Sequence, residues 1–242
     1  MPPQLTCLAN NAAKPFAKHF MNLGFGTEII YSFVIILASL MIYFGTKELY
    51  ELSSHKGIKY FRQAFLFFAI AYFFRSFIKF ALVYFNERAI LDICPRTIMP
   101  TINHITLFIF MYFSSMAIFY LLYSVMWKKW NGNPNKLYLF HLLAIALSII
   151  MLVSRNPLVY LLVNIFLLGF VIMGVYISHN EKKSKLKHNN LYTIYILLFI
   201  FWIINILEIL IPKYFQTSKL FIYLASIGVF LTILYKVLKK SG

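Results

Sequence analysis

Two basic residues lie inside an apolar stretch of the sequence, where a charged side chain is costly. Arg75 and Lys79 are four residues apart within residues 60–84, so in a helix they share one face. One acidic residue, Glu208, lies inside a second apolar stretch, 191–211. Ionisable side chains inside a membrane helix usually pair with one another or line a watery cavity. These three residues can therefore form an ion pair or bind a charged ligand.

The elements that would position these residues are seven apolar stretches. A hydrocarbon core of about 30 Å takes roughly 20 residues of helix, and we place the helices at 29–44, 60–84, 101–127, 137–153, 157–178, 191–211 and 219–238. The runs are continuous and not alternating, which predicts helices and argues against a membrane β-barrel. We therefore expect an all-α integral membrane protein, a single seven-helix membrane domain over residues 1–242 with a tail at 1–28.

Lysine and arginine are divided unequally between the two sides of the predicted helices. Fourteen of them flank the helices on the side where the carboxyl terminus lies, and seven flank them on the side where the amino terminus lies. Basic loops stay in the cytoplasm. We therefore predict an extracellular amino terminus with the 1–28 tail, a cytoplasmic carboxyl terminus, and a multi-pass location in the cell membrane. The abundance of lysine and isoleucine is typical of an A+T-rich prokaryotic genome.

Polar residues collect at the depth that this orientation assigns to the outer half of the bilayer. At 1.5 Å per residue, Arg75 lies roughly 5 Å beyond the midplane, Lys79 roughly 11 Å and Glu208 about 10 Å. Glu28 opens the first predicted helix at the same level. The side chains that we predict to bind a ligand there are Arg75, Lys79, His104, Asn164, Asn205 and Glu208.

Two interpretations of this cluster remain open. In one, Arg75 and Glu208 form a buried salt bridge that only fixes the packing of two helices, and Lys79 extends to the outer interface. In the other, two cations against one carboxylate leave a positive pocket for a small anionic or zwitterionic ligand that arrives from outside. In that case His104 can make binding respond to pH, because an unperturbed histidine titrates near about 6.5.

The composition favours a non-enzymatic sensor or receptor-like protein. No aspartate lies in a predicted span, and no G-x-S-x-G, H-E-x-x-H or P-loop motif occurs, so we expect no catalytic residue, metal or cofactor. No proline interrupts a predicted span, unlike the broken helices of many secondary transporters. The alternatives are a transporter or channel for a small solute or ion that uses the same pocket, and a structural subunit of a membrane complex.

The predicted helix count and orientation resemble those of rhodopsins and other seven-helix receptors. This resemblance implies a retinal-binding lysine midway along the last helix, and residues 221–232 contain none. We therefore expect no retinal and assign no family from the count.

The net charge of +16 comes from basic residues that flank the predicted helices. Anionic lipid head groups explain such residues, at about 1 kcal/mol each near the surface, and nucleic acid is not expected. The basic run 181–187 faces the cytoplasm in this topology. Because the predicted domain leaves no room for an output domain, a cytoplasmic protein partner at these inner loops would be needed for signalling.

The two cysteines are both predicted to lie outside. Cys7 is in the tail and Cys94 is in the loop between the second and third predicted helices. A disulfide persists in an oxidising environment, so these two residues can tie the tail over the outer end of the bundle. Two free thiols are the alternative.

Overall fold

The computed structural model describes residues 23–87, 95–127, 129–130, 135–154, 156–184, 189–211 and 216–241. These residues form α-helices joined by short connections and contain no strand. The helices are α3 (Leu23–Gly45), α4 (Lys47–Ser53), α5 (Lys56–Glu87), α6 (Pro95–Met126), α7 (Asn135–Val153), α8 (Pro157–Ser184), α9 (Asn189–Leu210) and α10 (Gln216–Ser241). The prediction of an all-α protein is confirmed for the described residues.

Six helical segments within the described ranges are long and apolar enough to cross a membrane. They are Gly26–Ser53, His104–Met126, Asn135–Val153, Leu158–Asn180, Tyr192–Leu210 and Ser218–Lys239. The chain is therefore a multi-pass membrane protein with a helical bundle. The long helix α5, which carries Arg75 and Lys79, is not among these six segments.

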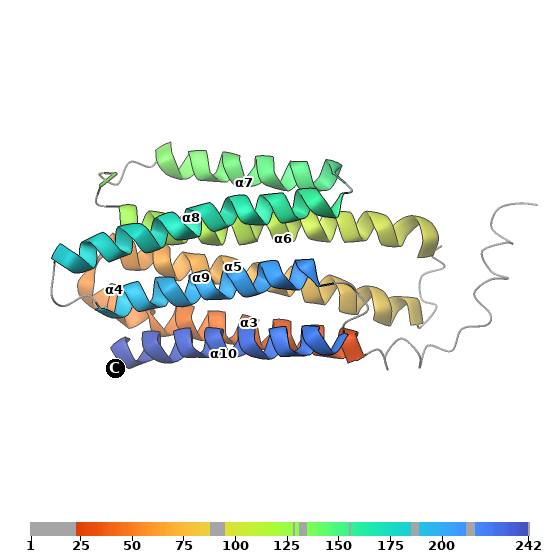
Figure 1. The fold of residues 1–242 in the computed structure, drawn as a ribbon, viewed down its shortest axis with the longest axis horizontal. Helices are drawn as coiled ribbons and strands as arrows, with labels where there is room; N and C mark the ends of the chain where they lie inside the picture. Colours follow the sequence, from red (N-terminus) through yellow and green to blue (C-terminus); the bar gives the residue numbers. More distant parts are fainter. Residues whose placement is uncertain are drawn as a thin grey trace, which may run out of the picture.

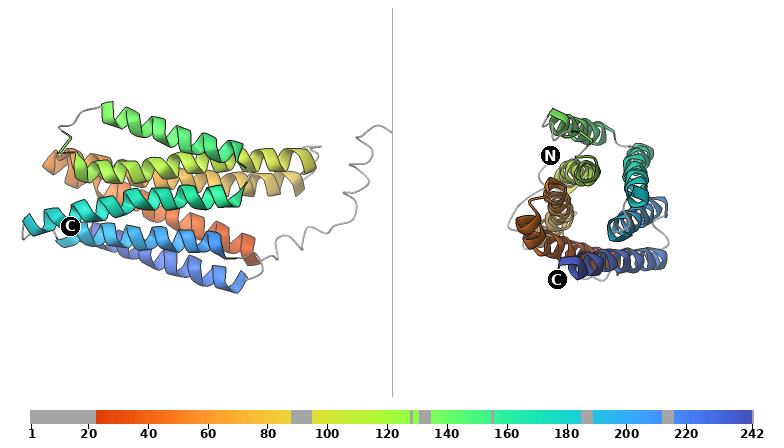
Figure 2. Two further views of the ribbon diagram at one scale, coloured as in Figure 1. Left: turned by 45° about the horizontal axis from the view of Figure 1, so that its top comes forward. Right: turned by 90° about the vertical axis from the view of Figure 1, so that its left-hand side faces the viewer.

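The long helices alternate in direction and form a closed ring with one helix outside it. Around the ring, α3 packs against α5, α5 against α6, α6 against α8, α8 against α9, α9 against α10, and α10 against α3. Helix α7 packs mainly against α6 and lies outside the ring (Figures 1 and 2). The ring therefore encloses an interior to which helices far apart in the sequence contribute side chains.

The buried residues of α3 and α5 recur every three or four positions, as expected for one face of a helix. On α3 the buried face includes Tyr31, Ile35 and Ile42, whereas Phe33 and Phe44 on the other face are exposed. Both faces are apolar because one packs against protein and the other faces the hydrocarbon of the membrane. The exposed apolar side chains of α3 are therefore consistent with a membrane helix.

Helix α5 is packed tightly into the ring by aromatic and small side chains. Ala64 and Ala71 are fully buried, and such small residues let neighbouring helices approach closely. Phe68 meets Phe201 of α9 with ring centroids 6.3 Å apart, and Phe65 meets Phe230 of α10 at 6.0 Å. Helix α5 therefore runs between its neighbours in the bundle and brings Arg75 into the interior.

The observed helices extend beyond the predicted spans. Helix α3 begins at Leu23, so the predicted tail at 1–28 is too long, and residues 1–22 lie outside the described part. The glycines at 24 and 26 interrupt the apolar run, so the predicted helix begins only at Ile29, whereas the observed helix continues through both glycines. The short helix α4 was not predicted, because its seven residues mix charged and apolar types and form no apolar run. Helix α6 begins at Pro95, so Pro100 lies inside its first turns and before the span that starts at His104.

Candidate functional site

An ion-pair network connects three helices at one end of the bundle. We call this the Glu28 end; there α3, α6, α8 and α10 begin and α5, α7 and α9 end. The guanidinium of Arg75 donates from Nε to Oε1 of Glu28 on α3, and from Nη2 to Oε1 of Glu208 on α9, both at 3.2 Å. The three side chains are 13–20% exposed. The predicted pairing of Arg75 with Glu208 is present, and Glu28 is a second carboxylate on the same arginine.

Two aromatic side chains complete the surroundings of these charges. The hydroxyl of Tyr223, on α10, donates to the same Oε1 of Glu208 at 2.9 Å. The ring of Phe110, on α6, lies 5.2 Å from the guanidinium carbon of Arg75 and covers one face of the cation. Cation–π contacts of this kind favour a charged guanidinium away from bulk water. Five ring helices, α3, α5, α6, α9 and α10, therefore contribute to one charged cluster.

Hydroxyl groups form a second polar layer, about one helical turn deeper in the bundle. The Tyr31 hydroxyl lies 3.1 Å from the hydroxyls of both Tyr72 and Ser226, and Tyr72 donates to Oδ1 of Asn205 at 3.2 Å. The amide of Asn205 donates back to the Phe201 carbonyl at 2.8 Å. Buried polar groups are costly unless they are hydrogen-bonded. This layer therefore satisfies its members and holds α3, α5, α9 and α10 in register.

A cavity of about 230 Å³ lies beside the ion-pair network. Liquid water occupies about 30 Å³ per molecule, so the cavity has the volume of about eight waters. Polar and apolar side chains line it from five helices: Tyr72 and Arg75 of α5, Phe110 and Ser114 of α6, Tyr160 and Asn164 of α8, Trp202, Asn205, Glu208 and Ile209 of α9, and Lys219 of α10, with Ile211 just after α9. Charged and polar groups that converge beside aromatic and aliphatic side chains are typical of a ligand site.

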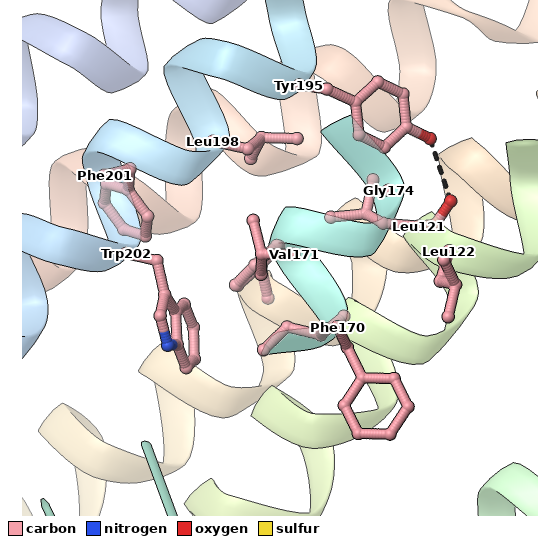
Figure 3. A pocket seen from close by; sticks show the side chains of 11 residues that line it. Leu121, Leu122, Phe170, Val171, Gly174, Tyr195, Leu198, Phe201 and Trp202 are labelled. Atoms are coloured by element: carbon pink, nitrogen blue, oxygen red, sulfur yellow. Dashed lines mark hydrogen bonds between the residues drawn. The ribbon is translucent and has the colours of Figure 1, made fainter. Parts of the chain in front are cut away.

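Trp202 forms the floor of this cavity. Its indole nitrogen donates to the carbonyl oxygen of Asn164 at 3.2 Å, which fixes the ring between α8 and α9. On the other side of Trp202 is a second space of only about 20 Å³, enclosed by α5, α6, α8 and α9 (Figure 3). Its lining is almost wholly apolar and includes Phe68, Phe170 and Phe201. The cavity is therefore closed toward the opposite end of the bundle by packed aromatic side chains.

Four of the predicted site residues share this cavity. Arg75, Asn164, Asn205 and Glu208 all line it. His104 is a described residue of α6 but does not line the cavity. It lies six residues before Phe110, which places it about 120° away around the helix and about 9 Å along it. The side chain of Lys79, together with Cys7 and Cys94, lies outside the described residues.

The sequence analysis missed two charged groups at the site. Glu28 was noted for its depth but not as a partner of Arg75, and Lys219 was counted only as a flanking basic residue. Equal depth was the signal that connects Glu28 to Arg75. The described residues contain no group of three or more histidine, cysteine, aspartate or glutamate side chains that could hold a metal.

Comparison with known proteins finds a relative that spans nearly the whole chain. The sequence is 31% identical to an uncharacterized protein of Archaeoglobus fulgidus over 215 residues, which are 88% of this chain and 92% of that protein. The chain belongs to the same family as this archaeal protein. No family model matches the sequence, and no solved structure matches it. The alignment covers enough of both chains to include most of the bundle.

Proposed function

We propose that this protein is a non-enzymatic, receptor-like sensor of the cell membrane, which binds a small anionic or zwitterionic ligand in the cavity at the Glu28 end. The observation that supports this proposal is the charged cavity with a closed floor. Arg75, Glu208 and Lys219 supply charges at its wall, and Trp202 with the aromatic side chains behind it blocks passage to the other end. A ligand that enters such a cavity must leave by the way it came.

The proposal includes seven spans, with α5 as the seventh. Helix α5 has 32 residues, which is long enough to cross the hydrocarbon core, and it packs between α3 and α6. Its interior charge is compensated by the two glutamates. The proposed orientation rests on the basic residues, fourteen on the side of the Gly45 end of α3 and seven on the side of the Glu28 end. The cavity then opens to the outside, and the carboxyl terminus is cytoplasmic.

The basic side is also where we propose that a cytoplasmic partner docks. Described lysines there include the exposed Lys47, Lys59 and Lys239. Anionic lipid head groups attract such residues as well. An acidic protein surface that binds at this side would detect changes in helix packing that a ligand causes at the Glu28 end.

One observation favours the second candidate function, a carrier of small solutes. The narrow space behind Trp202 continues the line of the cavity between α6, α8 and α9, and Gly174 there presents no side chain. If Trp202 moved into that space, a path through the bundle would open. Transport therefore depends on a movement that the sensor does not need.

Binding and flux measured on one preparation separate the two functions. The full chain, purified and reconstituted into phosphatidylcholine liposomes, is first screened by thermal shift with the common amino acids, acetate, lactate, succinate and phosphate. Each radiolabelled compound that stabilises the protein is then tested for uptake. Stabilisation without saturable uptake above protein-free liposomes is the expected result. Saturable uptake would contradict the proposal of a sensor and favour a carrier. If no compound stabilises the protein, the proposed ligand site is wrong.

A further inference from the structure

The guanidinium of Arg75 has donors that no described residue uses. An arginine has five N–H groups in a planar fork. The two glutamates accept one from Nε and one from Nη2, and Phe110 covers a face of the group. Among the described residues no acceptor binds Nη1, so both of its N–H groups and one of Nη2 remain. Because Arg75 lines the cavity, these donors are available to an oxyanion within it.

Two further groups of the cavity wall carry unused charge. Lys219 lines the cavity and has no ion pair or hydrogen bond with any described residue. On Glu208, Arg75 and Tyr223 both donate to Oε1, and no described donor reaches Oε2. The cavity wall therefore offers cationic donors from Arg75 and Lys219, and a carboxylate oxygen from Glu208, which lies next to Arg75. Phe110, Tyr160 and Trp202 give the rest of the wall an aromatic part, beside serine, asparagine and isoleucine side chains.

We infer that the cavity binds a free α-amino acid with an apolar or aromatic side chain. This inference rests on the proposed function and gives its ligand class. The ligand carboxylate accepts from the terminal N–H groups of Arg75 and from Lys219, since a planar carboxylate matches the arginine fork. The ligand ammonium donates to Oε2 of Glu208. The ligand side chain lies against the aromatic wall, and a volume of about 230 Å³ limits it to a single small molecule.

Alternative ligands match the wall less well. A simple carboxylate leaves Oε2 of Glu208 without a donor, and an amine leaves the remaining N–H groups of Arg75 and the ammonium of Lys219 without a ligand acceptor. A buried group that loses its water and gains no partner weakens binding, and a charged group does so more than a neutral one. Each deletion from the ligand should therefore weaken binding by at least about tenfold, which corresponds to about 1.4 kcal/mol.

Trp202 provides the readout for this inference. The chain has three tryptophans, Trp127, Trp130 and Trp202, and only Trp202 lines the cavity. In the double variant W127F/W130F, emission comes from Trp202 alone. The protein in phosphatidylcholine nanodiscs is titrated with L-leucine and L-phenylalanine, with their amides, and with the matching acids 4-methylpentanoate and 3-phenylpropanoate. The thermal shift of the unmodified chain is measured with the same six compounds.

The expected result is saturable binding of at least one amino acid, and at least tenfold weaker binding of its amide and of its deaminated acid. K219M should weaken the binding of the amino acid and the binding of the deaminated acid by the same factor. K219R should restore much of the affinity. K236M, at the far end of α10, should leave the affinity unchanged. Equal affinity for the amino acid and the deaminated acid would overturn the zwitterion inference but leave a carboxylate sensor. The absence of any response to all six compounds, in a folded protein that another anion stabilises, would also overturn it. A protein that responds to no compound at all would overturn the proposed function as well.

Discussion

Removal of Arg75 should destabilise the protein more than removal of Glu208. Arg75→Leu leaves two carboxylates, Glu28 and Glu208, without their shared cation at sites that are 20% and 13% exposed. Removal of one partner from a buried ion pair costs about 3–5 kcal/mol. Glu208→Leu removes one charged hydrogen bond from Arg75, worth about 1.5–3 kcal/mol, and Arg75 keeps Glu28 as its partner. We therefore expect a difference of about 2 kcal/mol between the two variants.

The double and triple variants test the same reasoning. In Arg75→Leu/Glu208→Leu the carboxylate of Glu208 is gone and Glu28 alone loses Arg75, so the loss should be smaller than the sum of the single losses. Glu28→Gln added to this pair should recover part of the remaining loss. The measurement is the free energy of unfolding from equilibrium denaturation in mixed micelles. Lys59→Leu, an exposed charge on the other end of α5, should stay within about 0.5 kcal/mol of the unmodified chain. Equal losses for the two single variants, with additive double-mutant behaviour, would refute a shared cation.

Three further changes test other parts of the molecule. A reporter at the carboxyl terminus should be cytoplasmic and an amino-terminal tag extracellular; protease access to the carboxyl terminus in intact cells would reverse the orientation. If Cys7 and Cys94 are paired, the denatured, unreduced chain should bind no thiol reagent and the reduced chain two equivalents; labelling before reduction would reject the pair. Gly57→Ala should lower the melting temperature, because its Cβ would lie 2.8 Å from the Ser124 carbonyl oxygen. Gly174→Ala, whose Cβ meets only a side chain at 3.5 Å, should be neutral or stabilising, and equal effects would contradict this contrast.

Six of the long helices were predictable because each has an apolar run, and such runs need no knowledge of neighbours. The run of α5 is interrupted by Arg75 and Lys79, and its helix was predicted from the apolar residues around them. The ends of the helices were not predictable, because the length of an apolar run matches the thickness of the hydrocarbon core and a helix can extend beyond it. Helix α3, for example, already begins at Leu23. The short helix α4 has no run of this kind. The apolar pattern thus gives the position of each long helix in the sequence, and leaves its ends open.

At the site, depth was predictable and rotation was not. Arg75 and Glu208 have opposite charges at similar depth, and the structure pairs them. Whether Glu28 also reaches Arg75 depends on α3 lying beside α5, and the exclusion of His104 depends on how α6 is turned about its axis. The position of α3 and the rotation of α6 both follow from how the helices pack in the ring, and this packing depends on the shapes of the side chains as well as on their polarity. Lys219 was overlooked because a lysine near a helix end is usually interfacial.

The order of residues in the ion-pair network has a consequence for biosynthesis. Glu28 precedes Arg75 by 47 residues, whereas Glu208 follows it by 133. At about 5–20 residues per second, Glu208 is synthesised roughly 7–27 s after Arg75. An arginine alone in the bilayer is costly. Because α3 is already made when α5 leaves the ribosome, Glu28 can serve as a counter-ion during insertion, so the arginine need not wait unpaired for the rest of the chain.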